Sequence, residues 1–153
     1  MAALITTTVK SNNASIIFIT DTDRVILVRD SRDGNWMLPG GHRDGDETDF
    51  ECALREFREE TSLLINPTYF ISIQSEIRIH TNGSKTNIFI IRSTQRFPEY
   101  DASKVLNSET DALHYLQLKD LKKIVNGSQH RYITKLKDYI VRSLSDLYTR
   151  QII

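Results

Sequence analysis

Two early stretches of the chain concentrate isoleucine and valine in the way that β-strands do. The runs SIIFIT (15–20) and RVILVRD (24–30) are separated by the turn-like residues 21–23. Short β-rich runs joined by polar turn residues predict a β-hairpin. The sequence WMLPGG (36–41) follows within a few residues.

The middle of the chain repeats this alternation. The runs TYFISIQSEIRIHT (68–81) and TNIFIIRST (86–94) flank Asn82 and Gly83, a dipeptide that favours tight turns. A second pair of strands is therefore predicted. The run ALHYLQL (112–118) predicts one more short strand, and the intervening segment 92–111 is expected to be a long irregular loop.

The C-terminal region changes from strand to helical periodicity. From Arg131 onward, apolar residues recur at helical spacing, and this pattern predicts an amphipathic helix. We interpret its apolar stripe as part of the core rather than a partner surface. The stripe consists of Ile133, Leu136, Ile140, Leu144 and Leu147.

An earlier helix is predicted by its capping residues. Thr48 and Glu51 have the spacing of a capping box, so a helix is expected to begin near Asp49. One face of this helix is apolar and should lie against the sheet: Phe50, Ala53, Leu54, Phe57 and Thr61. At about 100° per residue, a different face carries three carboxylates, from Glu56, Glu59 and Glu60.

Composition limits the setting in which this helix acts. The chain has 153 residues, which suits one domain, and its twenty basic residues balance twenty acidic ones. The net charge gives no reason to expect nucleic acid as a partner. Cys52 is the only cysteine and no run is long enough to cross a membrane, so we expect a soluble cytoplasmic protein.

The three clustered carboxylates require an explanation. Like charges this close raise one another's pKa unless a cation lies among them, and oxygen ligands favour a hard divalent ion such as Mg²⁺. The alternative is a solvated helix with Glu51–Arg55 and Arg55–Glu59 ion pairs. Both interpretations are compatible with the helix alone.

The wider spacing favours the metal site. Gly41, Glu47 and the segment REFREE (55–60) resemble the Nudix box, G-x5-E-x7-R-E-U-x-E-E-x-G-U, where U is a bulky aliphatic residue. Leu63 fills the last position. Phe57 replaces an aliphatic residue, and Ser62 stands where the family has a glycine that suits a left-handed helix end.

The resemblance implies a fold and a reaction. The implied fold is α/β, an α/β/α sandwich with a mixed β-sheet, forming a single Nudix hydrolase domain over residues 1–153. The implied reaction is hydrolysis of a nucleoside diphosphate linked to another moiety, a small-molecule phosphoanhydride, with Mg²⁺ or Mn²⁺ as cofactor. A catalytically silent nucleotide-binding module is the alternative in a different class.

Site residues follow from the match, position by position. The resemblance implies that Glu56 and Glu60 bind the metal directly and that Glu59 binds it directly or through water. The carbonyl of Gly41, or that of Gly40, would complete the shell. Arg55 and Glu47 would orient the loop and the helix. The general base is left open between Glu56 or Glu59 and an acid of the long loop, which offers Glu99, Glu109 and Asp111.

Substrate recognition is predicted less sharply. Arg29 ends a strand leading to the site, Trp36 could stack on a base, and His42 follows the glycines. Arg78, His80 and Lys85 form a basic group around the second hairpin. The open substrates include nucleoside triphosphates, dinucleoside polyphosphates, nucleotide sugars, diphosphoinositol polyphosphates and an mRNA cap, and a homodimer is also left open.

Overall fold

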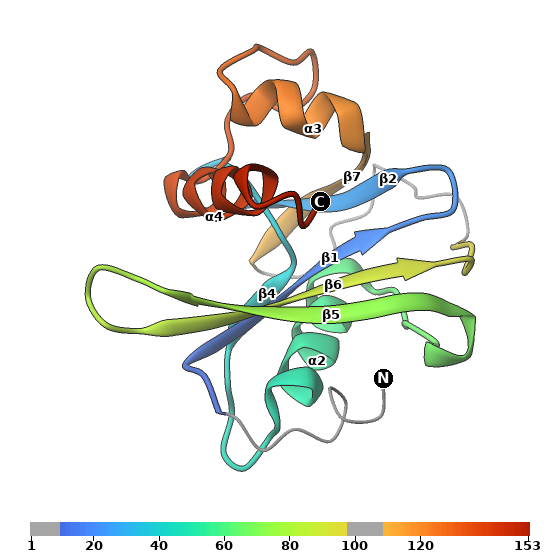
Figure 1. Cartoon of the computed structure of the whole chain (residues 1–153), viewed down its shortest axis with the longest axis vertical. Coiled ribbons are helices and arrows are strands. Elements are labelled where there is room, and N and C mark those ends of the chain that lie inside the picture. The colour runs from blue at the N-terminus through green and yellow to red at the C-terminus, as the bar shows by residue number, and fades with distance from the viewer. Residues whose placement is uncertain (1–9, 98–108) are drawn as a thin grey trace.

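The computed structural model of the chain describes residues 10–97 and 109–153. Within these ranges it contains one sheet of seven strands and three α-helices (Figure 1). The strands are β1 (Asn13–Ile19), β2 (Arg24–Asp30), β3 (Trp36–Met37), β4 (Gly40–His42), β5 (Phe70–Ile79), β6 (Lys85–Ser93) and β7 (Thr110–Gln117). The helices are α2 (Asp49–Thr61), α3 (Leu118–Val125) and α4 (Asp138–Thr149), and a 3₁₀ turn, η1, spans Pro67–Tyr69.

The sheet is mixed because one of its pairings is parallel. Its central order is β3-β2-β1-β6-β5, with β4 also paired to β1 and β7 to β2. Strand β6 runs parallel to β1, and the other pairs are antiparallel. Both predicted hairpins are confirmed, β1–β2 and β5–β6.

Strands β1 and β2 separate soon after their turn. The register between them contains one pair, Ile19 with Val25, whereas β7 pairs along the whole of β2. The start of β1 instead pairs with β4, which places Gly40 opposite Ser15 and Gly41 opposite Ala14. This exchange of partners holds Gly40 and Gly41 of β4 against the centre of the sheet.

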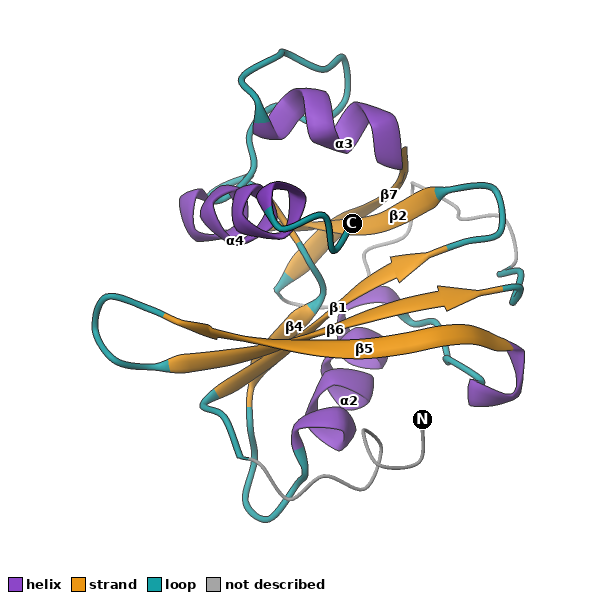
Figure 2. Ribbon diagram, viewed as in Figure 1, coloured by secondary structure: helices purple, strands orange, loops and turns teal. Residues whose placement is uncertain are grey.

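Helices cover the sheet in two groups. Helix α2 crosses behind β1, β6 and β5, while α3 and α4 lie together at the other end of the view (Figure 2). Phe57 of α2 and Phe18 of β1 are fully buried with ring centroids 5.9 Å apart. The apolar face predicted for α2 therefore belongs to the core. No helix in residues 10–97 or 109–153 is long and apolar enough to span a membrane.

Helix α2 begins and ends as its sequence predicts. The Thr48 hydroxyl accepts from the Glu51 N–H at 3.1 Å, and the Glu51 carboxylate accepts from the Thr48 N–H at 3.1 Å. At the other end, Ser62 adopts a left-handed conformation with φ 60° and donates its N–H to the Arg58 carbonyl. Ser62 therefore adopts the left-handed conformation that suits the glycine found at this position of the Nudix box.

The prediction for the C-terminal helix is wrong at its start. Helix α4 begins at Asp138 rather than Arg131, although the predicted stripe is buried throughout. The physical reason is that backbone groups near residue 136 pair with Trp36 instead of closing helical turns. The Trp36 N–H donates to the Lys135 carbonyl at 2.7 Å, and the Lys137 N–H donates to the Trp36 carbonyl at 2.9 Å. Helix α3, which follows β7 without a break, was not predicted.

The junction between β2 and α4 contains a buried ion pair. Asp30 is 1% exposed, and its carboxylate accepts from Lys137 Nζ at 2.6 Å. Arg32 donates to both oxygens of the same carboxylate. These hydrogen bonds hold the pKa of Asp30 well below its usual range despite burial. The two cations therefore keep Asp30 charged and fix the start of α4 against β2.

Replacing Ser62 by glycine should stabilise the protein. A left-handed conformation costs a non-glycine residue roughly 1 kcal/mol, so Ser62→Gly should raise the free energy of unfolding by about that amount. The expected rise in Tm is about 2–4 °C for a chain of this size. Ser145→Gly, within helix α4, is the matched control and should lower Tm, because glycine weakens a helix interior. Equal effects of both substitutions would contradict this interpretation of Ser62.

Candidate active site

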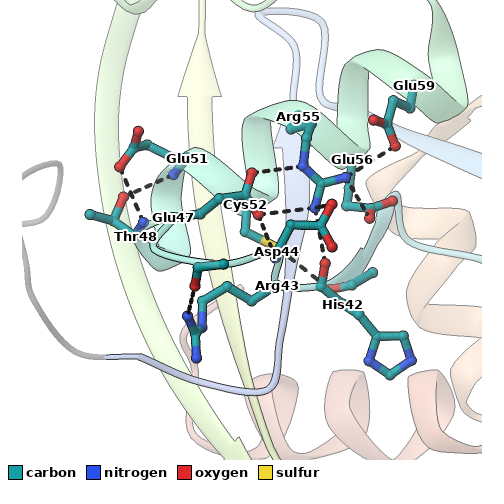
Figure 3. A network of polar contacts seen from close by, with 12 residues as sticks. His42, Arg43, Asp44, Glu47, Thr48, Glu51, Cys52, Arg55, Glu56 and Glu59 are labelled. Atoms are coloured by element: carbon teal, nitrogen blue, oxygen red, sulfur yellow. Dashed lines mark hydrogen bonds and ion pairs between the residues drawn. The ribbon is translucent and has the colours of Figure 1, made fainter.

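Arg55 joins helix α2 to the loop that precedes it (Figure 3). Its Nε donates to Glu47 Oε2 at 2.7 Å and its NH2 donates to Glu47 Oε1 at 3.0 Å, a two-point contact. The same NH2 group donates to the carbonyl of His42 at 2.9 Å. These bonds raise the pKa of Arg55 and lower that of Glu47, so both remain charged. The loop is thereby held against the helix.

The remaining guanidinium nitrogen faces two of the predicted metal ligands. Arg55 NH1 donates to Glu56 Oε1 at 3.0 Å and to Glu59 Oε2 at 3.1 Å. Glu59 is largely exposed, whereas the Glu56 side chain is 13% exposed. Burial raises the pKa of Glu56, with Arg55 opposing the rise and Glu59 and Glu109 adding to it. Arg55 therefore partly neutralises two carboxylates that would otherwise repel each other.

Glu60 is the most deeply buried acid of the cluster. It is 1% exposed, and one of its oxygens accepts from the Gly40 N–H at 2.8 Å. The other oxygen, Oε2, is buried without a hydrogen-bond partner among the described residues. Burial raises the pKa of Glu60 to about 8, against the Gly40 hydrogen bond. A buried oxygen left in this state is suited to binding a cation.

The two glycines permit these close contacts. A Cβ at Gly41 would lie 2.6 Å from the Glu56 carboxyl carbon, and one at Gly40 would lie 2.5 Å from the Ala14 carbonyl oxygen. Any larger residue would thus push away either the carboxylate or strand β1. The absence of side chains here lets Glu56 lie directly against the turn.

These features fit a divalent metal that shares its coordination with substrate. In residues 10–97 and 109–153, no three His, Cys, Asp or Glu side chains form a ready-made metal site. Mg²⁺ commonly uses only one or two protein carboxylates, with water and substrate phosphates supplying the rest. Glu60 Oε2 and the Glu56 carboxylate beside Gly41 could provide that number.

Glu109 lies close enough to the cluster to act on it electrostatically. Its charge contributes to the raised pKa of both Glu56 and Glu60. Its backbone carbonyl accepts from the Ser31 N–H at 2.9 Å, which anchors the start of β7 to the loop after β2. Of the other loop acids considered, Glu99 lies outside the described residues, and Asp111 is paired with Arg29 at 2.7 Å.

The prediction that Trp36 stacks on a substrate base does not fit the structure. Trp36 is 4% exposed, because its backbone is held between β2 and residues 135–137 and its ring packs edge-on against His114. The Arg29 guanidinium lies 5.7 Å from the centre of the ring. Both residues therefore contribute to packing beside the site.

The structure separates the three residues of the predicted basic group, Arg78, His80 and Lys85. Arg78 lies 3.7 Å from Asp146 of helix α4, and Lys85 is exposed near the start of β6. His80, in contrast, lines a cavity that also contacts Gly40 and Gly41. His42 is exposed, and its ring points away from the Arg55 network (Figure 3). Cys52 is fully buried, and burial raises its thiol pKa to about 12, as expected for a packing residue.

Sequence reasoning missed two residues of this cavity, Tyr139 and Arg142. Both belong to α4 and line the cavity together with Ile140 of the buried stripe. Neither residue belongs to the predicted apolar stripe, so helical periodicity gave them no predicted role. The folding of α4 toward the β5–β6 turn brings them to the cavity.

Comparison with known proteins identifies the family. The NUDIX domain matches residues 10–136, and the chain belongs to this family. The predicted α/β fold and the predicted membership of the Nudix hydrolase family are thus confirmed. Hydrolases of this family generally use divalent metal ions.

Individual relatives are more distant. The mRNA-decapping enzyme subunit 2 of Saccharomyces cerevisiae (strain YJM789) is 26% identical over 128 residues, which cover 84% of this chain and 12% of that protein. The 8-oxo-dGDP phosphatase NUDT18 of Mus musculus is 31% identical over 61 residues, 38% of this chain and 19% of that protein. This chain therefore spans only a small part of the length of either relative.

A solved structure supports the same fold. A C. elegans Ap4A hydrolase superposes with a TM-score of 0.59 at 16% identity, covering 90% of this chain and 98% of the other. At this identity, the likeness concerns the architecture alone.

The raised pKa of Glu60 predicts a pH-dependent stability in chelator. Because its folded pKa is about 8 against an ordinary 4.5, its ionisation opposes folding. The stability is therefore fully present below pH 4.5 and is lost as pH rises through about 8. Thermal unfolding should show Tm falling as the pH rises from about 4.5 to about 8 and levelling off above that, and Glu60→Gln should flatten this fall. Glu76→Gln, on β5, is the control and should leave the fall unchanged. The same slope in all three proteins would contradict the burial of a titrating Glu60.

Proposed function

We propose that the protein is a divalent-metal-dependent pyrophosphohydrolase. Its substrate would be a nucleoside diphosphate linked to another moiety, and its cofactor would be Mg²⁺ or Mn²⁺. The observation that carries the proposal is Glu60 Oε2, which is buried beside Gly40 and Gly41 and has no hydrogen-bond partner among residues 10–97 and 109–153. A carboxylate buried for packing alone would be expected to have both oxygens paired.

Each acid of the cluster has a role in this proposal. Glu56 and Glu60 would hold the metal, and the carbonyl of Gly41 or Gly40 would add a ligand. When bound, the metal would neutralise phosphate charge and favour activation of water. Glu59, which shares the NH1 group of Arg55 with Glu56, would bind directly or through water. The contact between Arg55 and Glu47 holds the helix that carries these side chains against the preceding loop.

The hydrolysis itself needs a proton acceptor. Water attacks phosphorus, the anhydride P–O bond breaks, and the water proton passes to a carboxylate. Glu56, Glu59 and Glu109 are the three acceptors that the structure supports, and the charge of Glu109 reaches both Glu56 and Glu60.

An mRNA cap is the second candidate substrate. It is favoured by the similarity to the yeast mRNA-decapping enzyme subunit 2, which extends over 84% of this chain. A cap also contains the phosphoanhydride linkage on which the proposed chemistry acts. The matched region is 12% of the decapping enzyme.

The test is a hydrolysis assay on the purified protein with Mg²⁺ or Mn²⁺. Its substrates are nucleoside triphosphates, dinucleoside polyphosphates, nucleotide sugars, diphosphoinositol polyphosphates and capped RNA, with products identified by mass. We expect metal-dependent cleavage of one class, and a fall of at least about 100-fold in kcat for Glu60→Gln. Glu76→Gln, on β5, should retain activity. Nucleotide binding without turnover would overturn the proposal and favour the silent binding module.

A further inference from the structure

A second cavity lies at the end of the sheet away from the glycines of β4. Its volume is about 620 Å³, and four parts of the chain line it: the β1–β2 turn, the end of β6, the β7–α3 junction and the end of α4. The start of β1 pairs with Gly40 and Gly41, whereas its last residue, Ile19, precedes this turn (Figure 1). A strand of seven residues is on the order of 20 Å long, so this cavity is separate from the acid cluster.

Positive charge predominates among the side chains of this cavity. Arg92, Lys119 and Lys122 supply three cations, and Asp23 is the one acidic side chain among the described lining residues. Arg92 Nη1 lies 3.7 Å from Asp23 Oδ1, and the Asp23 side chain is 76% exposed, so this ion pair is loose. One exposed carboxylate cannot neutralise three cations, and an excess of positive charge remains.

The two lysines are neighbours on helix α3. They are three residues apart, a spacing that places both on one face of the helix, where like charges repel each other. Among the described residues neither ammonium group has an ion pair or a hydrogen bond, and Lys122 Nζ lies 5.8 Å from the centre of the Tyr148 ring. Asp120, the acid of the same helical turn, is not among the described lining residues. An anion bound between Lys119 and Lys122 would relieve their repulsion.

Uncharged groups complete the wall of the cavity. The Tyr148 hydroxyl donates to the Leu118 carbonyl at 3.4 Å, a long contact. Burial raises the pKa of Tyr148 to about 12, so its hydroxyl stays neutral and adds no negative charge. Thr22 and Gln117 contribute further uncharged polar side chains. The cavity therefore combines three cations with neutral hydrogen-bonding groups.

The number of cations indicates the class of ligand. Arginine binds phosphate through parallel hydrogen bonds, and lysine binds it as a point charge. Three cations from two different elements match the several negative charges of a phosphate chain better than the charge of one phosphate. The volume lies within the range of small-molecule sites, about 300–1,000 Å³.

We propose that this cavity binds the phosphate chain of a small di- or triphosphate, with Arg92 on one side of the chain and Lys119 and Lys122 on the other. Free inorganic pyrophosphate or triphosphate and the phosphate chain of a nucleotide share this chemistry. The site is additional to the acid cluster and supplies no group to the hydrolysis. It therefore does not depend on the proposed function.

The first experiment measures binding by isothermal titration calorimetry in chelator, which prevents metal-dependent turnover. The probes are pyrophosphate, triphosphate, ADP and ATP, with adenosine as the comparison that lacks phosphate. We expect the four anions to bind, adenosine not to bind, and the affinity to fall as the salt concentration rises from about 0.05 to 0.5 M. Tighter binding of pyrophosphate than of ADP would identify the inorganic anion as the ligand, and the reverse order would identify the nucleotide.

Matched charge variants test whether the cavity is the binding site. Lys119→Gln combined with Lys122→Gln should weaken binding at least about tenfold, the value of one lost charged hydrogen bond. Lys119→Arg combined with Lys122→Arg keeps both charges and should retain binding. Lys123→Gln combined with Lys135→Gln makes the same change of charge outside the cavity and should leave the affinity unchanged.

A further variant separates this cavity from the one that Arg142 lines beside Gly40 and Gly41. The affinity for pyrophosphate should be unchanged in Arg142→Gln. Pyrophosphate should also shift the amide NMR signals of Thr22 and Gln117 rather than those of the two glycines.

Several results would overturn the proposal. They are an equal affinity in wild type and in folded protein with Lys119→Gln and Lys122→Gln, a Kd above about 10 mM for all four anions, and loss of binding in Arg142→Gln alone. Tighter binding of an RNA oligonucleotide without terminal phosphates than of triphosphate would also overturn it, in favour of a nucleic-acid surface. Circular dichroism of each variant separates loss of fold from loss of binding. Absence of turnover in the hydrolysis assay would reject the hydrolase and leave these binding results unchanged, so the two proposals fail separately.

Discussion

Burial of the Glu60 carboxylate is the constraint on which the site depends. Removing a charged group from water is costly unless partners replace the water, and the protein supplies one donor, the Gly40 N–H at 2.8 Å. The second oxygen has no partner among the described residues. Folding thus buries a carboxylate oxygen that a bound cation would stabilise. The stability of the helix is therefore linked to metal binding at the site.

The surroundings of Glu60 preserve this arrangement. The capping box fixes where α2 starts, and Phe57 holds its apolar face in the core. Together they determine the rotation of the helix about its axis and therefore the direction in which its acids point. Pairing with β1 then places Gly40 and Gly41 of strand β4 beside the helix. Arg55 completes the arrangement, because its contacts with Glu47 tie the loop to the helix while it neutralises Glu56 and Glu59. A side chain on Gly41 would disturb this packing at once.

The sequence predicted those parts of the structure that local patterns determine. The two hairpins, the capping box and the left-handed Ser62 follow from short-range chemistry that acts within a few residues. The start of α4 did not, because Trp36 pairs with the backbone near Leu136 from a hundred residues away. The same long-range pairing buries Trp36, whose ring was predicted to be free to stack on a base.

The differences among the acids were likewise outside the reach of helical periodicity. The pattern placed Glu56, Glu59 and Glu60 on one surface, yet Glu60 is buried and Glu59 is largely exposed. Glu60 accepts a hydrogen bond from Gly40 of β4, whereas Glu59 accepts one from Arg55 at the surface. The cavity residues of α4 were missed for a similar reason. Tyr139 and Arg142 line a cavity only because the β5–β6 turn, distant in sequence, lines it with them.

The most direct measurement is the affinity of the protein for Mn²⁺, by calorimetry or electron paramagnetic resonance, with and without Glu60→Gln. The buried, half-paired carboxylate should make Glu60 a metal ligand, so the substitution should raise the Kd for Mn²⁺ at least about tenfold while Glu76→Gln leaves it unchanged. An equal Kd in wild type and folded Glu60→Gln protein would contradict the central role assigned to Glu60.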